Sequence, residues 1–244
     1  MSRKKRKSSR AARARAERSE GTLGDWLRML LIWGGLFFLI RFFVLQTFVI
    51  ISGSMMDTLL LGDFLVVNRA AIGSPIPGTS IRIPGYSSPK RFDILVFDPP
   101  HEENMMLVKR LIGLPGDTLE MRDKTLYING SVANEPYAQH NPASEDHSDI
   151  RMTWQTPFLV PGADADSYRP SRDDWGPIII PPDNYFMLGD NRDESQDSRY
   201  WGLLEGWRLE GRALFIYYSY ERGTMTPFPW LRRIRWDRIG DRIR

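Results

Sequence analysis

The chain has 244 residues, of which 42% are hydrophobic and 12% aromatic, so it can build a sizeable core and is not globally disordered. The net charge of +3 is unevenly distributed: residues 1–18 carry nine Lys or Arg and one Glu, whereas the rest carries 24 Lys or Arg against 29 Asp or Glu. There are no cysteines, which excludes disulfides and thiolate zinc sites.

The basic N-terminal segment, residues 1–20, has no apolar periodicity and is expected to be a disordered tail. A nucleic-acid arm is one interpretation, but the following segment favours another. Residues 26–51 are the most apolar stretch of the chain. Their uncharged centre, residues 29–40, is only about 18 Å long as a helix, which is shorter than the ~30 Å hydrocarbon layer. Arg28 and Arg41 flank this centre, and their long side chains can reach the head groups.

We therefore predict one membrane-spanning helix within residues 21–45. The basic tail then stays in the cytoplasm, because positively charged flanks are retained there, and residues 46–244 lie beyond the membrane. Two alternatives stay open: an amphipathic helix buried in a soluble protein, and a signal peptide cleaved near Ser52 and Ser54. With a membrane helix, lipids are expected partners and nucleic acid is not.

Beyond the apolar stretch the chain is expected to be mostly β, because no long helical pattern interrupts its strand-like runs. Seven runs of β-branched and aromatic residues bounded by Gly, Pro or Asp predict strands within residues 63–69, 91–97, 104–114, 117–121, 124–133, 184–190 and 211–220. Asn129-Gly130 is expected to be a hairpin turn.

Two further segments are less regular. Residues 131–180 are richer in Pro, Asp, Ser and His, and we expect them to form a small irregular β insertion. The terminal "FPWLRRIRWDRIGDRIR" alternates Trp, Ile and Arg. It fits a segment lying on a membrane surface and fits an ordinary terminal strand or helix equally well.

A serine at the start of the β region is a candidate nucleophile. "SGSMMDTLLLGD", residues 52–63, places Ser54 directly after the apolar stretch. The chain has no G-x-S-x-G elbow, H-E-x-x-H helix or Walker loop, and no metal or cofactor is expected. The three histidines, His101, His140 and His147, lie in polar segments and are expected to be loop residues.

A lysine can replace histidine as the base if burial lowers its pKa far enough. Lys109 in "NMMLVKRLIGLPGD" has apolar neighbours on both sides. In a strand Lys109 and Arg110 face opposite sides, so one can point inward while the other meets solvent or a carboxylate. The dense charges of "GDNRDESQDSRYWG", residues 189–202, follow an apolar strand and suggest an ion-paired loop packed on a site.

In this order and spacing, the three segments resemble the type I signal peptidases (bacterial leader peptidases), membrane-bound Ser/Lys proteases that remove signal peptides. "KRFDILVF" resembles the strand motif between the first two segments, and the resemblance covers roughly residues 20–220, with "IRWDRIG" also similar. It implies a signal-peptidase-like β-fold domain anchored by one N-terminal transmembrane helix in the bacterial inner membrane, with its catalytic domain on the periplasmic side. It also implies cleavage after small residues, Ala-X-Ala-like, and contact with the protein export machinery.

The resemblance implies a role for each matching residue. Ser54 matches the nucleophile, Lys109 the general base, and Ser195 the serine that hydrogen-bonds and orients the lysine. The backbone N–H of Ser54 and the hydroxyl of Ser52 match the oxyanion hole.

Two ion pairs match those that support the site: Asp197 with Arg199, and Asp190 with Arg110. The positions that match the linings of the substrate pockets are Phe48, Ile50, Met55, Leu59, Leu107 and Val108.

Three positions depart from the family pattern. Ile51 and Asp57 stand where the family usually has proline, and Phe92 stands where it usually has glycine. We expect Asp57 to face solvent at a turn, and a proline at that position to fit the backbone. A related class, the Ser/Lys self-cleaving repressors, is disfavoured by the membrane helix. A non-catalytic peptide-binding protein inactivated by Asp57 is disfavoured by the intact Ser54, Lys109 and Ser195.

Overall fold

The computed structural model describes residues 23–75, 79, 81–102, 105–223 and 228–243. The predicted basic tail, residues 1–20, lies outside the described residues. The chain divides into two units, Met1–Phe42 and Phe43–Arg244, and each is considered by itself.

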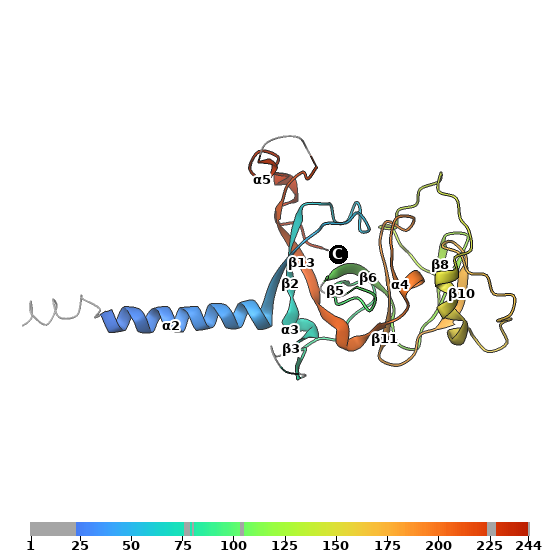
Figure 1. The fold of residues 1–244 in the computed structure, drawn as a ribbon, viewed down its shortest axis with the longest axis horizontal. Helices are drawn as coiled ribbons and strands as arrows, with labels where there is room; N and C mark the ends of the chain where they lie inside the picture. The colour runs from blue at the N-terminus through green and yellow to red at the C-terminus, as the bar shows by residue number, and fades with distance from the viewer. Residues whose placement is uncertain (1–22, 76–78, 80, 103–104, 224–227, 244) are drawn as a thin grey trace, which may run out of the picture. The chain divides into compact units, whose positions relative to one another are not determined.

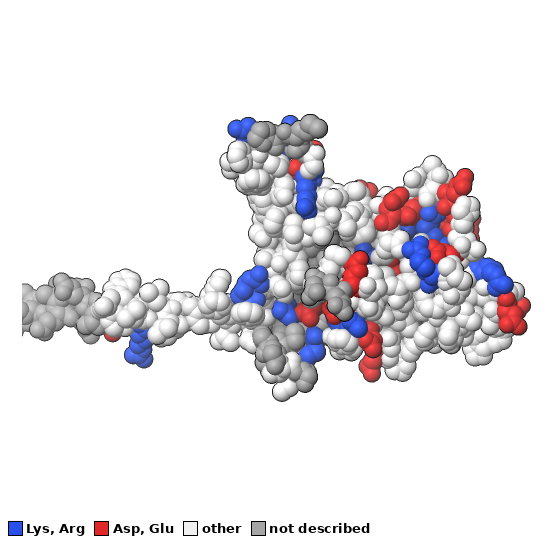
Figure 2. Space-filling model, in the orientation of Figure 1, with Lys and Arg blue, Asp and Glu red and all other residues white. Residues whose placement is uncertain are grey.

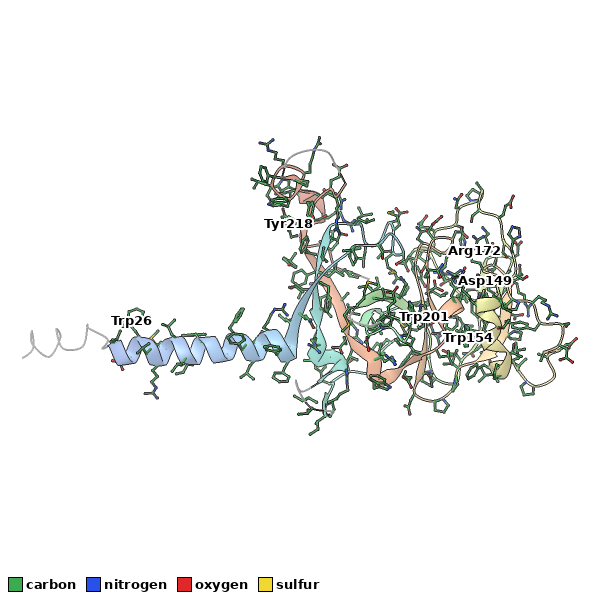
Figure 3. All side chains as sticks on the ribbon, in the orientation of Figure 1. Trp26, Asp149, Trp154, Arg172, Trp201 and Tyr218 are labelled. Carbon is green, nitrogen blue, oxygen red and sulfur yellow. The ribbon has the colours of Figure 1, made fainter. Side chains whose placement is uncertain are left out.

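The described part of the first unit is an apolar helix. α2 (Leu23–Leu39) continues into a π-helical turn, η1 (Ile40–Val44). The combined stretch Leu23–Val44 contains an 18-residue window with a mean hydropathy of 1.9, has no buried residue and is long and apolar enough to cross a membrane. Its surface is largely free of charged side chains (Figure 2), and Trp26 projects from its first turn (Figure 3). The predicted N-terminal apolar helix is therefore confirmed as a candidate membrane span.

The second unit is built around a seven-stranded antiparallel sheet, here called the core sheet, with strand order β1-β2-β13-β5-β6-β11-β12 (Figure 1). Its strands are β1 (Leu45–Val49), β2 (Asp63–Asn68), β5 (Ile94–Phe97), β6 (Leu107–Gly113), β11 (Asn184–Leu188), β12 (Leu204–Glu205) and β13 (Leu209–Ser219). Four of these strands lie within predicted runs, and β13 overlaps its run but begins two residues before it. β1 was missed because its apolar residues continue directly from the apolar helix.

A four-stranded sheet of order β10-β7-β8-β9 packs beside β11 (Figure 1). Its strands are β7 (Thr118–Arg122), β8 (Thr125–Ile128), β9 (Ser131–Val132) and β10 (Trp175–Ile179). The predicted hairpin turn is confirmed: Asn129 and Gly130 have φ of 51° and 78° and join β8 to β9. We call residues 117–180 the small lobe. This lobe also contains the 3₁₀ helix η2 (Ile150–Phe158), which carries Trp154 (Figure 3).

Shared apolar side chains join the small lobe to the core sheet. Phe186 of β11 is fully buried and stacks on Trp175 of β10, with ring centroids 5.0 Å apart. Leu119 and Leu126 of the small sheet pack in the same cluster as Ile112 of β6. Each such side chain contributes about 1.5–3 kcal/mol when fully buried, so the small lobe and the core sheet stabilise one another.

The remaining elements are short. They are the hairpin β3 (Gly73–Pro75) and β4 (Arg82–Pro84), the helices α3 (Arg69–Ile72), α4 (Ser198–Trp201) and α5 (Pro229–Arg232), and the 3₁₀ turns η3 (Gly206–Arg208) and η4 (Trp236–Arg238).

The C-terminal segment is held on the core sheet by a buried carboxylate. Asp63, fully buried at the start of β2, accepts hydrogen bonds from Arg238 at 2.7 Å and from the Ser219 hydroxyl at 2.6 Å. This is the ordinary terminal packing that the sequence allowed. The alternative, a segment lying on a membrane surface, stays a prediction.

Two of the residues that depart from the family pattern have a backbone in the left-handed region. Asp57 has φ of 70° and Phe92 has φ of 71°. Asp57 is exposed, which confirms the prediction that it faces solvent. The expectation that proline would fit there is wrong, because the proline ring fixes φ near −65°. Phe92 keeps this strained backbone while its ring packs against Tyr137 and the small-lobe core.

We predict opposite effects for two substitutions at Asp57. Asp57→Gly should leave the free energy of unfolding unchanged or raise it by a few tenths of a kcal/mol, because glycine adopts positive φ without strain. Asp57→Pro should lower it by ~1–3 kcal/mol, because the backbone must rearrange. Urea unfolding measures both. Asp183→Gly is the matched control, since Asp183 is also exposed with φ of 58°. An Asp57→Pro variant as stable as the parent protein would contradict the left-handed assignment.

Candidate active site

A tight turn between β1 and β2, residues 52–58, presents Ser54. The backbone N–H of Met56 donates to the Gly53 carbonyl at 3.0 Å, and that of Leu59 to the Met55 carbonyl at 2.7 Å. Met55 and Leu59 are buried in the core cluster of the sheet. These two apolar anchors fix the turn, so that Ser54, 7% exposed, lies at the inner edge of a cavity.

Lys109 reaches Ser54 from the middle of the core sheet. It pairs with Leu95 in the β5–β6 ladder, and its side chain is 2% exposed. The ammonium Nζ donates a hydrogen bond to the Ser54 Oγ, 55 residues away in sequence. The Ser52 Oγ lies 3.4 Å from the Ser54 Oγ. The structure thus brings together Ser52, Ser54 and Lys109.

The surroundings of Lys109 make its ammonium group lose a proton more readily than that of an exposed lysine. Burial lowers the pKa of Lys109 from its ordinary value of 10.5 to about 8. The carboxylates of Asp197 and Asp190 act against this shift, and the guanidinium of Arg199 acts with it. A fraction of the lysine is therefore neutral near neutral pH, as a proton acceptor requires.

Both carboxylates near Lys109 are held by arginines. Arg110 is 1% exposed and donates to the two oxygens of Asp190 at 2.8 and 2.6 Å. Arg199 donates to the two oxygens of Asp197 at 2.8 Å each. Burial opposes ionisation of Asp197, yet the bound Arg199 holds the pKa of its carboxyl below the ordinary value. Both predicted ion pairs are present, and Arg110 meets a carboxylate as expected.

We call residues 189–197 the acidic loop. Gly189 at its start lies so close to the serine turn that a Cβ there would be 2.5 Å from the Ser54 carbonyl oxygen and 2.1 Å from the Ser195 Oγ. The Ser195 Oγ is buried and has no hydrogen-bond partner among the described residues. A hydrogen bond from Lys109 to Ser195, as the resemblance implies, is therefore not formed among the described residues, where the Lys109 ammonium donates to Ser54.

A cavity of about 380 Å³ opens in front of Ser54. It is lined by residues 49–55, by His101, Glu102 and residues 105–109, and by Glu194 and Gln196 of the acidic loop. Four of the predicted pocket residues line it, namely Ile50, Met55, Leu107 and Val108. Phe48 and Leu59 instead pack in the apolar cluster of the core sheet.

The histidines lie as expected in exposed segments. His101 borders the cavity and stacks on Trp201, with ring centroids 5.6 Å apart. Among the described residues, no group of three or more His, Asp or Glu side chains is arranged to hold a metal ion.

Sequence reasoning missed several residues that complete the site. The Thr58 hydroxyl donates to Asp190 at 2.6 Å, and the Tyr137 ring lies 3.7 Å from the Arg110 guanidinium carbon. Asn191 donates to the serine turn, and Arg192 pairs with Glu135. Arg192 stood out by its place in the charged segment. Tyr137 and Glu135 lie far away in sequence, and no motif marks them.

Known proteins match most of the chain. Residues 23–218 match the family model described as signal peptidase, peptidase S26. Signal peptidase I of Pseudomonas aeruginosa is 34% identical over 209 residues, which cover 80% of this chain and 72% of its own. Signal peptidase I of Bacillus licheniformis is 33% identical over 202 residues, covering 82% and 91%.

A signal peptidase I P of Bacillus subtilis subsp. natto is 34% identical over 207 residues, covering 84% of this chain and 95% of its own. A crystal structure of a signal peptidase I from Enterococcus faecalis V583 is 34% identical, covers 52% of this chain and 97% of its own, and has a TM-score of 0.35. The family match and the three relatives, each covering more than two thirds of both chains, show that this chain belongs to the signal peptidase family, peptidase S26.

Proposed function

We propose that this chain is a membrane-bound serine endopeptidase that cleaves signal peptides from exported preproteins after small residues, with Ser54 as nucleophile and Lys109 as general base. The observation that carries the proposal is the buried Lys109 ammonium, whose pKa is lowered to about 8 and which donates to the Ser54 hydroxyl. A neutral lysine at this distance can accept the serine proton.

An extended peptide fits the cavity. β6 pairs with β5 through residues 107–110, whereas β11 pairs with β6 only from Arg110 onward. Within the described residues no strand pairs with the other edge of residues 107–109, so that edge can accept a substrate strand. In an extended peptide alternate side chains point the same way. The apolar lining by Ile50, Met55 and Val108 suits small side chains at two alternate positions.

The reaction then proceeds by acyl transfer. The Ser54 Oγ attacks the scissile carbonyl carbon while Lys109 Nζ takes its proton. The backbone N–H of Ser54 and the Ser52 hydroxyl stabilise the resulting oxyanion. Lys109 passes the proton to the leaving amine as the C–N bond breaks. A water molecule then attacks the acyl-enzyme, giving its proton to Lys109, which returns one to Ser54.

Other parts of the site support Lys109. The unpartnered Ser195 Oγ is a free acceptor for a second N–H of Lys109 once the serine has lost its proton. Asp57 is exposed and is not among the charges that shift the pKa of Lys109. This supports an active enzyme over a peptide-binding protein inactivated by Asp57.

The main test removes either member of the pair. Ser54→Ala and Lys109→Ala should each lower kcat/KM for a preprotein with an Ala-X-Ala site by at least about a thousandfold while the protein stays folded. Lys109→Arg should be as inactive, because arginine stays protonated. Lys90→Ala is the control, since Lys90 is exposed. Full turnover by Lys109→Ala together with loss in His101→Ala would disprove the Ser/Lys mechanism.

The pH dependence gives a second test. Below the pKa of Lys109, about 8, the base is protonated, so kcat/KM should fall tenfold per pH unit as the pH decreases. Asp57→Asn should leave this rising limb in place, because the exposed carboxylate does not act on the lysine. A displacement of the limb to lower pH by one unit or more in Asp57→Asn would contradict the outward orientation.

We further propose that the tail is cytoplasmic and that residues 46–244 lie on the periplasmic side of a bacterial inner membrane, near lipids and the export machinery. The support is the basic tail before α2. Protease added to spheroplasts should digest residues 46–244 and spare an epitope placed in the tail. Digestion of the tail with a protected domain would reverse the assignment, and a mature protein lacking residues 1–51 would favour a cleaved signal peptide.

A further inference from the structure

The acidic loop touches the main chain of the serine turn through one residue, Asn191. The backbone N–H of Asn191 donates to the Ser54 carbonyl at 3.1 Å, and its side-chain Nδ2 donates to the Gly53 carbonyl at 3.1 Å. One residue thus binds two consecutive carbonyl groups, one on each side of the serine.

The second of these bonds acts on the peptide unit that joins Gly53 to Ser54. The Gly53 carbonyl and the Ser54 N–H belong to the same planar trans unit, so the C=O and N–H bonds point in opposite directions. Holding the carbonyl oxygen on the side of the acidic loop directs the N–H the other way. Within the described part of the chain, this N–H donates no hydrogen bond of its own. It is therefore free to meet an oxyanion.

This peptide unit needs external restraint. Glycine on its N-terminal side gives the backbone wide conformational freedom, so the unit can rotate with little steric resistance. Only one other hydrogen bond to the Gly53 carbonyl is present among the described residues, from the N–H of Met56 at 3.0 Å. Asn191 adds a second donor, which both restrains the rotation and polarises the N–H.

Asn191 is in turn held by the small lobe. The N–H of Gln139 donates to the Asp190 carbonyl at 2.7 Å, and the N–H of Arg192 donates to the Gln139 carbonyl at 3.0 Å. Arg192, 1% exposed, also binds both oxygens of Glu135, at 2.9 and 2.5 Å. Residues on both sides of Asn191 are thus fixed by residues 135–139.

We propose that Asn191 is a positioning residue that aims the Ser54 N–H at the oxyanion, and that residues 135–139 of the small lobe hold Asn191 in register for this task. The inference rests on the proposed function, because an oxyanion arises only if Ser54 is the nucleophile. It assigns the small lobe a part in the reaction, although no residue of that lobe lines the cavity.

The test uses two side-chain variants of the full-length protein in detergent. Asn191→Leu keeps the size of the side chain and Asn191→Ala removes it, and neither donates to Gly53. Losing a whole oxyanion donor costs ~10²–10³ in rate. In these variants the hydrogen bond from the Met56 N–H still restrains the Gly53 carbonyl, so the loss should be smaller, and kcat should fall by roughly 10- to 100-fold. KM should stay within about threefold, because the Ser54 N–H meets an oxyanion only in the transition state.

Two further readouts separate this role from a general loosening of the site. A peptide aldehyde, whose adduct with Ser54 places an oxygen in the oxyanion position, should bind more weakly by about the same factor as kcat. The rising limb of the pH profile should not move, because Lys109 is untouched. Asn184→Leu is the matched control: its Nδ2 also donates to a carbonyl, that of Pro182 at 2.9 Å, and its kinetics should match those of the parent protein.

The outcomes are distinct. A parent protein that cleaves no preprotein refutes the proposed function. An active parent protein with both Asn191 variants within twofold of its kcat overturns this inference alone. So does a loss of kcat accompanied by a shifted pH limb, which would mean that Asn191 acts through Lys109. Should Asn191→Leu fail to fold, Asn191→Ala carries the test. Unfolding of both variants, seen by circular dichroism, would assign Asn191 a structural role and overturn the proposal.

Discussion

The structure around the cavity depends on one requirement, that a lysine ammonium lie inside an apolar sheet and still reach a serine. Burial is the largest cause that lowers the pKa of Lys109, and a strand inside the core sheet provides that burial. The serine comes from another segment of the chain, 55 residues away from the lysine. A turn between β1 and β2 therefore brings Ser54 over the buried strand.

Charge near the lysine has to be balanced, because a free carboxylate would raise its pKa again. Asp190 and Asp197 both lie near enough to act on Lys109, and each is bound through both oxygens by an arginine. Buried ion pairs of this kind add little net stability. They do fix geometry, since planar guanidinium groups bind carboxylates in one orientation. The two ion pairs therefore fix the conformation of the acidic loop and limit how far its carboxylates raise the pKa of Lys109.

The sequence predicted most of the core sheet and the central contact of the site. Strands with apolar and aromatic runs were identifiable, whereas β3, β4 and β12 are too short to show a period and Gly176-Pro177 interrupts β10. Ser54 and Lys109 were identifiable because each belongs to a motif. Thr58, Tyr137 and Asn191 were not, since their partners lie far away in sequence. Backbone dihedral angles could not be predicted from the sequence either, as the positive φ of Asp57 shows.

The buried lysine also affects how the protein folds at different pH. The unfolded chain holds its lysine proton up to about pH 10.5, whereas the folded protein releases it at about 8. Below pH 8 folding must therefore bury a charged lysine, which at ~1.4 kcal/mol per pH unit opposes folding by about 3 kcal/mol. This cost declines as the pH rises from 8 to 10.5 and then vanishes. Replacing Lys109 by methionine should consequently raise the midpoint of thermal unfolding at pH 7 more than at pH 10. The residue on which turnover is proposed to depend is therefore one that lowers the stability of the folded protein near neutral pH.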